Sequence, residues 1–260
     1  FTPSNVIRLC VEMLDPRPGE RIIDPACGSA RFEIECMFYM VQNYGVDERE
    51  LRDLASFTIF GIDKEIDMAR IAKAYMTMIG GDASNIYCAD SLDPESWPDS
   101  MKKKIKDGSF DVVFTNPPFG SRICIDDKRI LRLYKLGHRW KCSGGKWVML
   151  NRLLEKQAPQ ILFIERCLQL LKPGGRMAIV LPDGVFGNPR QRYVIEFIMQ
   201  EAKILAVVSL PPETFLPSTH TKTSIIFLEK TDGPVDEDYE IFMAIANKVG
   251  HDKNGKIIYK

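Results

Sequence analysis

Asn116, Pro117, Pro118 and Phe119 directly follow an apolar run, residues 112–115, that is typical of a buried strand. The amide oxygen of Asn116 and the carbonyl oxygen of Pro117 are two acceptors on a backbone that the prolines stiffen. Two acceptors at one exocyclic amine orient its N–H bonds and draw its lone pair out of ring conjugation. The lone pair can then attack an electrophilic methyl group while Phe119 stacks on the ring. These four residues predict methyl transfer to a planar nitrogen, with a plain turn as the alternative.

A second candidate site lies where the predicted strand at residues 21–24 turns into a helix. The segment Asp24-Pro25-Ala26-Cys27-Gly28 combines an acid at a strand end with a glycine turn. Such a turn brings backbone N–H groups and a helix N-terminus close to a ligand. Because the segment does not match the G-x-G-x-x-G fingerprint of dinucleotide sites, a tight structural turn remains the alternative.

Two further acids end predicted strands. Asp63 follows the strand at residues 58–62, and Asp90 follows the strand at residues 86–89. An acid in the position of Asp63 commonly accepts hydrogen bonds from ribose hydroxyls, and the Asp90 carboxylate can accept from an adenine amino group. Each can instead cap a helix or a turn. Because the carboxyl ends of parallel strands meet at one edge, we expect both acids to lie near Asn116.

Strands and helices alternate along the chain, which predicts an α/β fold with a mostly parallel sheet. The pattern is that of a doubly wound, Rossmann-like fold with seven strands and with helices on both faces of the sheet. The expected strands are residues 21–24, 58–62, 86–89, 111–115, 177–181, 204–210 and 224–228. The expected helices are residues 6–14, 32–44, 66–79, 159–171 and 189–200.

An insertion, residues 120–150, interrupts this alternation directly after Phe119. Its first part, residues 120–146, has eight positive and two negative side chains, and eight minus two gives plus six. The cations are Arg122, Lys128, Arg129, Arg132, Lys135, Arg139, Lys141 and Lys146, and the acids are Asp126 and Asp127. This concentration of charge is typical of a phosphate-binding surface or of a solvated loop.

The 260 residues are predicted to form one main domain, residues 1–230, and a carboxyl-terminal extension, residues 231–260, that leads to a further part of a longer protein. Residues 239–259 have the pattern of a hairpin with its turn at residues 252–255. The formal net charge is zero, so the chain as a whole is not a polycation. No apolar stretch approaches the roughly 18–20 residues that span a bilayer. Seven unpatterned cysteines and three histidines without metal-ligand spacing favour a reducing, cytoplasmic setting and no metal site.

These motifs together resemble the class I S-adenosylmethionine-dependent methyltransferases, specifically the N6-adenine DNA methylases of bacterial restriction–modification systems. The chain is most similar to the catalytic domain of the modification (M) subunit of type I systems, from its start to about residue 230. The motifs that carry the resemblance are Phe1-Thr2-Pro3, Asp24-Pro-Ala-Cys-Gly-Ser29, Gly61-Ile-Asp63, Ala89-Asp-Ser91, Asn116-Pro-Pro-Phe119, Leu171-Lys-Pro-Gly-Gly175 and Lys222-Thr-Ser224.

The resemblance implies S-adenosyl-L-methionine as cofactor and a role for each matching position. The residues implied at the methionine end of the cofactor are Thr2, Pro3, Asp24, Pro25, Ala26 and Gly28. Those implied around its ribose and adenine are Asp63, Lys64, Asp90 and Ser91, and Asn116 and Pro118 also border it. The residues implied in catalysis on a flipped adenine are Asn116, Pro117, Pro118 and Phe119, with Phe215 as a further ring. Ala30 stands where the family often has glycine. Its extra methyl group narrows the approach of the backbone to the cofactor, and the change is expected to be tolerated because Gly28 occupies the sharper turn.

The implied activity is methylation of the N6 amine of adenine in DNA, with the base extruded from the duplex. The implied partners are double-stranded DNA, a specificity subunit or a fused target-recognition domain, a second methylase subunit and a restriction subunit, with no membrane. Two alternatives stay open. One is an N-methyltransferase of RNA bases or of protein glutamine, which the Phe-Thr-Pro and Lys-Thr-Ser motifs disfavour. The other is an inactive methylase fold that serves as a DNA-binding or assembly module.

Overall fold

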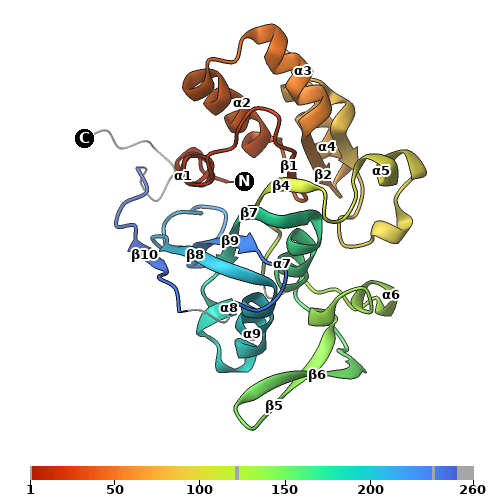
Figure 1. Ribbon diagram of the computed structural model, residues 1–260, viewed down its shortest axis with the longest axis vertical. Helices are drawn as coiled ribbons and strands as arrows, with labels where there is room; N and C mark the ends of the chain where they lie inside the picture. The colour runs from red at the N-terminus through yellow and green to blue at the C-terminus, as the bar shows by residue number, and fades with distance from the viewer. Residues whose placement is uncertain (1, 121–122, 236–237, 251–260) are drawn as a thin grey trace.

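A single eight-stranded sheet forms the centre of the computed structural model, which describes residues 2–120, 123–235 and 238–250 (Figure 1). Its strand order is β10-β8-β9-β7-β4-β1-β2-β3. Strand β9 runs antiparallel to both of its neighbours, and the other neighbouring pairs are parallel. The strands are β1 (Ile22–Asp24), β2 (Ile59–Asp63), β3 (Ile86–Cys88), β4 (Phe110–Thr115), β7 (Leu171–Pro182), β8 (Ala202–Ser209), β9 (Thr223–Lys230) and β10 (Phe242–Ile245).

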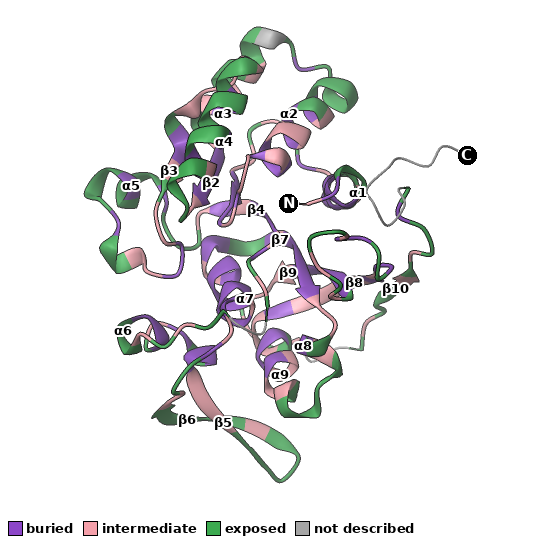
Figure 2. Ribbon diagram, turned by 180° about the vertical axis from the view of Figure 1, so that it is seen from behind, coloured by how far each residue is buried: buried purple, intermediate pink, exposed green. Residues whose placement is uncertain are grey.

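Helices cover both faces of this sheet because alternate residues of its strands point to opposite sides. Ile23 and Val113 lie in one core, together with residues of α5 (Asp99–Lys104), α7 (Pro159–Leu170) and α9 (Arg192–Glu201). Ile22 and Val112 lie in the other core, with α1 (Ser4–Leu14) and α2 (Arg31–Tyr44). Two more helices, α3 (Glu48–Thr58) and α4 (Ile66–Met78), extend that second layer over β2 and β3. Figure 2 shows buried residues concentrated in the strands and the inner helix faces.

The predicted doubly wound α/β fold is confirmed, and each of the seven expected strands and five expected helices is present. The strand count differs by one because β10 pairs in parallel with β8 and adds an eighth strand. The predicted hairpin turn at residues 252–255 lies outside the described residues, and the domain boundary at residue 230 stays a prediction. Helix α3 was not expected. Its signal is Asp47, whose carboxylate caps the helix by accepting from the Arg49 and Glu50 N–H groups.

The insertion after Phe119 is folded (Figure 1). It contains a short helix, α6 (Lys128–Leu131), and a separate two-stranded antiparallel sheet of β5 (His138–Ser143) and β6 (Lys146–Leu153). This hairpin projects from the body of the molecule beyond α6 and α9, and a further short helix, α8 (Gly184–Gly187), follows β7. Within the described ranges, no helix has both the length and the apolar character to cross a membrane.

One acid, Glu33, lies inside the second core. It is in the first turn of α2 and only 1% exposed, and neither carboxyl oxygen has a hydrogen-bond partner among the described residues. It packs against Gly61 of β2, where an added Cβ would lie 2.6 Å from Glu33 Oε1. Burial, followed by repulsion from Asp24, raises the pKa of the Glu33 carboxyl well above its ordinary value. The neutral acid is therefore the form that this position favours.

Glu33→Gln is expected to reduce the pH dependence of stability. Above the ordinary carboxyl pKa of 4.5 the folded chain holds the Glu33 proton more tightly than the unfolded chain does. The free energy of unfolding therefore falls as the pH rises, at most by about 1.4 kcal/mol per pH unit for one group. Glutamine keeps the shape and cannot ionise, so the variant should gain stability relative to the parent chain as the pH rises from 5 towards 8.

Urea unfolding of both chains over that pH range measures the effect. Glu165 also has a raised pKa and contributes equally to the two chains. Asp24 repels Glu33, so the difference between the curves reports the ionisation of Glu33 together with its effect on Asp24. Parallel stability curves for the two chains would contradict the assignment of a buried neutral acid.

Candidate active site

The candidate site lies at the carboxyl edge of the sheet, where four neighbouring strands end together. Strands β1 and β2 end at Asp24 and Asp63, Asp90 follows β3, and Asn116 follows β4. A cavity of about 530 Å³ opens at this edge. The predicted residues that line it are Pro25, Ala26, Gly28, Asp63, Lys64, Asp90, Ser91, Asn116 and Pro118. The sheet topology thus brings most of the predicted cofactor residues to one cavity.

Two carboxylates hold the loops around this cavity. Asp24 Oδ1 accepts from the Ala26 N–H at 2.8 Å, and Asp63 Oδ2 accepts from the Gly28 N–H at 2.9 Å. Asp63 Oδ1 also accepts from the Glu65 N–H at 2.8 Å, so this side chain joins the turn after β1 to the turn after β2. Burial raises the pKa of Asp24 to about 7. The alternative of a structural turn is therefore correct in part, because both acids shape the loops that they line.

The turn itself requires left-handed backbone at two positions. Gly28 has a φ of 54°, and Ala30 has a φ of 60°. Only glycine adopts this region without steric penalty. The departure at Ala30 thus adds backbone strain and does not block the turn.

An ion pair spans one wall of the cavity. Lys64 Nζ lies 2.9 Å from Asp90 Oδ2, and this hydrogen bond raises the pKa of Lys64. Asp90 Oδ1 accepts from the Leu92 N–H at 2.9 Å, so both of its carboxylate oxygens have a partner. Ser91 Oγ donates to the Pro25 carbonyl at 2.6 Å and ties this wall to the first loop. The sequence indicated each residue but not the Lys64–Asp90 pair.

Asn116 is held in one amide orientation. Its Nδ2 donates to Thr2 Oγ1 at 2.9 Å. Its Oδ1 is buried and has no hydrogen-bond partner in the described part of the chain. A buried acceptor without a partner is unusual in a folded protein and is a place where a ligand donor can bind. The geometry therefore leaves the acceptor of Asn116 available and its donor engaged.

Arg31 secures the segment that holds Asn116. Its Nη1 donates to the Thr2 carbonyl at 2.8 Å, and its Nη2 donates to Ser4 Oγ at 2.5 Å. Sequence reasoning missed this contact. Arg31 is the first residue of α2, and a cation at a helix N-terminus, where the dipole disfavours positive charge, was the available signal. Phe1 of the Phe-Thr-Pro motif lies outside the described residues, and Pro3 begins α1 as its N-cap.

Two aromatic rings meet beside the corner. Phe119 and Phe215 have ring centroids 6.0 Å apart with planes at 89°, an edge-to-face contact. Phe215 is buried, and Phe119 is half-buried. Pro117 is buried and Pro118 exposed, so the corner passes from the core to the surface within four residues. The structure brings the two predicted rings together, although not as parallel walls.

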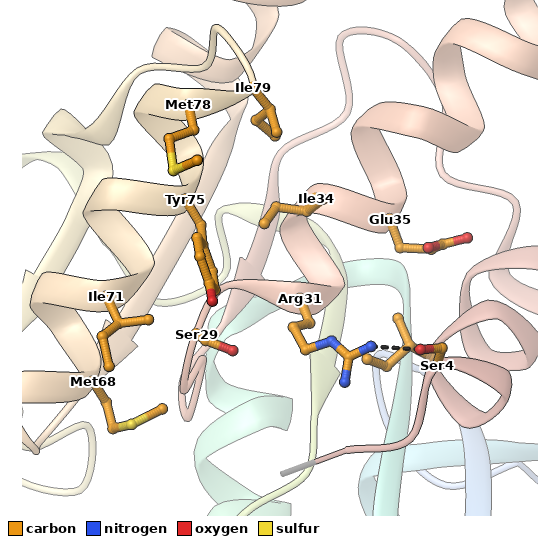
Figure 3. Close-up of a pocket in the computed structure, with 11 residues that line it drawn as sticks. Ser4, Ser29, Arg31, Ile34, Glu35, Met68, Ile71, Tyr75, Met78 and Ile79 are labelled. Carbon is orange, nitrogen blue, oxygen red and sulfur yellow. Dashed lines mark hydrogen bonds between the residues drawn. The ribbon is translucent and has the colours of Figure 1, made fainter. Parts of the chain in front are cut away.

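A larger cavity, about 650 Å³, lies outside this group, between the start of α1, α2 and α4 (Figure 3). Arg31 and Ser4 meet at its lower rim in Figure 3, and Tyr75 and Met78 of α4 face them across the opening. Met68 lines both this cavity and the cavity at the sheet edge. None of the residues that line the larger cavity is a predicted cofactor-binding or catalytic residue. The chemistry-bearing side chains therefore gather in the smaller cavity.

Comparisons with known proteins find relatives in both sequence and structure. The N-6 DNA Methylase family model matches residues 1–258. The methylase subunit of the type I restriction enzyme EcoEI from Escherichia coli is 28% identical in an alignment of 236 positions, which covers 88% of this chain and 42% of that subunit. A chain in a structure of the complex assembly and conformational transition of the type I R-M system is 28% identical with a TM-score of 0.74. That match covers 100% of this chain and 48% of the other.

The fold also recurs at lower identity. A Listeria monocytogenes protein described as a class I S-adenosylmethionine-dependent methyltransferase has a TM-score of 0.65 at 21% identity, over 95% of this chain and 64% of its own. The chain spans less than half the length of the EcoEI subunit that it matches. Since the family model covers nearly every residue, the chain belongs to the N-6 DNA methylase family.

Proposed function

We propose that this chain is the catalytic domain of a DNA adenine-N6 methyltransferase of a restriction–modification system. It transfers the methyl group of S-adenosyl-L-methionine to the exocyclic amine of a flipped adenine. The observation that carries the proposal is the state of Asn116. Its donor is occupied by Thr2, and its buried acceptor is free to take a hydrogen bond from an amine.

The chain's own residues orient the nucleophile. Asn116 Oδ1 and the Pro117 carbonyl accept the two N–H bonds of the target amine, which turns its lone pair away from the ring. The cofactor, when bound, supplies a methyl group on a positively charged sulfur. The new N–C bond would form as the bond between the methyl group and sulfur breaks, which leaves a neutral thioether. The methylated amine is then acidic and would lose one proton to water, so no strong base is required. Phe119 supports the flipped ring, and its stacking offsets part of the few kcal/mol that extrusion costs.

The cavity at the sheet edge fits the proposed cofactor by its donor and acceptor chemistry. Asp63 would accept from the ribose hydroxyls, and Asp24, Pro25, Ala26 and Gly28 would line the methionine end with Thr2 and Pro3. Ser91 and the Lys64–Asp90 pair would border the adenine edge. Leu92, Ile125 and Phe163 give the same cavity an apolar wall for a flat base. These residues would hold the group where Asn116 and Pro118 meet the cavity.

The proposed partners follow from the relatives, which include the methylase subunits of two type I restriction enzymes. We infer that the longer protein acts on double-stranded DNA in the cytoplasm. A specificity subunit or a fused target-recognition domain would choose the adenine, with a second methylase subunit and a restriction subunit in the complex. The catalytic corner supplies chemistry, and none of its residues distinguishes one adenine from another.

Asn116→Ala is expected to lower the methylation rate by about a hundredfold or more, because the amine loses a preorganised acceptor. Cofactor affinity, measured by titration calorimetry, should change by only a few fold. The assay uses the full-length methylase with the subunits that purify with it and follows tritiated methyl transfer to DNA. Methylation that persists at the parental rate would rule out this mechanism.

Thr2→Val tests how Asn116 is positioned. Valine keeps the shape of threonine but removes the acceptor for Asn116 Nδ2, so the amide can rotate and present its donor to the target amine. We expect a lower single-turnover rate, by roughly tenfold for one lost charge-neutral hydrogen bond. Thr2→Ser keeps the hydroxyl and should restore most of the rate. Equal rates in the valine and serine variants would show that the hydroxyl does not position Asn116.

A further inference from the structure

The inserted segment has an unusual charge distribution that the structure resolves into two groups. Between residues 128 and 154 there are eight Lys and Arg residues and no Asp or Glu. The first four cations lie on and after α6, and the other four lie on the β5–β6 hairpin. The two groups differ in what their side chains contact.

The cations around α6 already have partners. Arg129 pairs with Asp127 at 2.8 Å. Arg132 pairs with Glu95 at 3.6 Å, and Lys135 pairs with Glu201 at 2.5 Å. The Lys128 ammonium donates to two backbone carbonyls at the base of the hairpin, those of residues 154 and 155. This group therefore ties the insertion to the body of the protein.

The hairpin cations have no ion pair within the residues that the structure describes. They are Arg139, Lys141, Lys146 and Arg152. Lys141, Lys146 and Arg152 are exposed, and Arg139 is half-buried. Their difference from the α6 group is one of pairing and not of exposure, because Arg129, Arg132 and Lys135 are 55–65% exposed.

The register of the hairpin gives it two distinct faces. Lys141 is opposite Val148, and Ser143 is opposite Lys146, so both lysines share one face. The other face carries Trp140 and Trp147, whose rings lie 6.0 and 6.1 Å from the ring of Tyr193 in α9. The aromatic face packs on the body, and the basic face points away from it.

The base of the hairpin is anchored beside the candidate site. Gln157 Nε2 donates to the Leu136 carbonyl at 2.8 Å and to Tyr193 Oη at 3.0 Å. Gln157 also lines a cavity of about 530 Å³ with Gly120, the residue after the Asn116–Phe119 corner. Side-chain hydrogen bonds therefore fix the position of the hairpin relative to residues 116–119.

We propose that the exposed cations of the β5–β6 hairpin, Lys141, Lys146 and Arg152, bind the phosphates of the DNA duplex from which the adenine is flipped. The inference rests on the proposed function. A whole chain of zero net charge concentrates unpaired cations here, and each cation that meets a phosphate gains by counterion release. A two-stranded ribbon also fits the major groove, whose walls are phosphates. Contacts of this kind position the duplex and do not read its sequence.

The test compares two variants with equal loss of charge. The hairpin variant is Lys141→Gln, Lys146→Gln and Arg152→Gln, and the control is Arg129→Gln, Arg132→Gln and Lys135→Gln. Each is made in the full-length methylase with its co-purifying subunits, and thermal unfolding checks that both remain folded. DNA affinity is measured over a series of salt concentrations, on duplexes with and without the recognised sequence.

The hairpin variant should reduce the slope of log affinity against log salt by about 2–3, since each lost phosphate contact removes about 0.9. The control should reduce it by less than 1, because its cations are engaged by acids. The loss should be similar on both duplexes. Equal losses in the two variants, an unchanged slope in the hairpin variant, or a loss confined to one duplex would overturn the proposal. An acidic protein partner would appear as a subunit lost on purification with the slope unchanged.

The failure of this inference can be told apart from failure of the proposed function. If the parent protein binds cofactor and methylates DNA while the hairpin variant keeps its salt slope, only the hairpin assignment is wrong. If the parent protein methylates no DNA and binds no cofactor, the proposed function itself is wrong, and the hairpin assignment is overturned with it.

Discussion

Burial of the central strands on both faces is the constraint on which the arrangement of this protein depends. Strands β1, β2 and β4 lie between two helical layers, so their side chains must be apolar along most of their length. Polar groups can appear only where a strand leaves the sheet. Because the strands are parallel, those exits coincide at one edge. The acids and the amide therefore lie together at this edge although they are far apart in the sequence.

The same burial governs the electrostatics of the edge. Asp24 and Glu33 lie in low-dielectric surroundings, and both carboxyls hold their protons to a higher pH than in water. Asp63, which is more accessible, instead has its two oxygens on backbone N–H groups of two loops. Burial thus disfavours negative charge on Asp24, which shapes the loop after β1, whereas the Lys64–Asp90 ion pair lies at the exposed side of the cavity.

The sequence was sufficient for the sheet and for the set of residues at its edge, because apolar runs followed by Asp or Asn are local signals. It was insufficient where structure depends on pairing between distant segments. No local sequence pattern predicts which loops lie close together in space. Three such contacts are the Lys64–Asp90 pair, the Arg31 contacts and the Thr2–Asn116 hydrogen bond. Strand β10 has four residues and pairs with β8, which comes much earlier in the chain. The sequence alone therefore predicted one arm of a local hairpin here. The charge of the insertion was visible in the sequence. Which of its cations are paired was not, because two of the pairing acids, Glu95 and Glu201, lie outside the insertion.

The hydrogen bond between Thr2 and Asn116 joins residues 114 positions apart. Contacts of such long range form late in folding, because the loop that they close must be ordered first. Loss of this hydrogen bond would leave both cores in place and release the amide of Asn116. The chemistry of this domain is thus coupled to how the segment before α1 docks at the sheet edge, because a residue from outside the sheet sets the orientation of the catalytic amide.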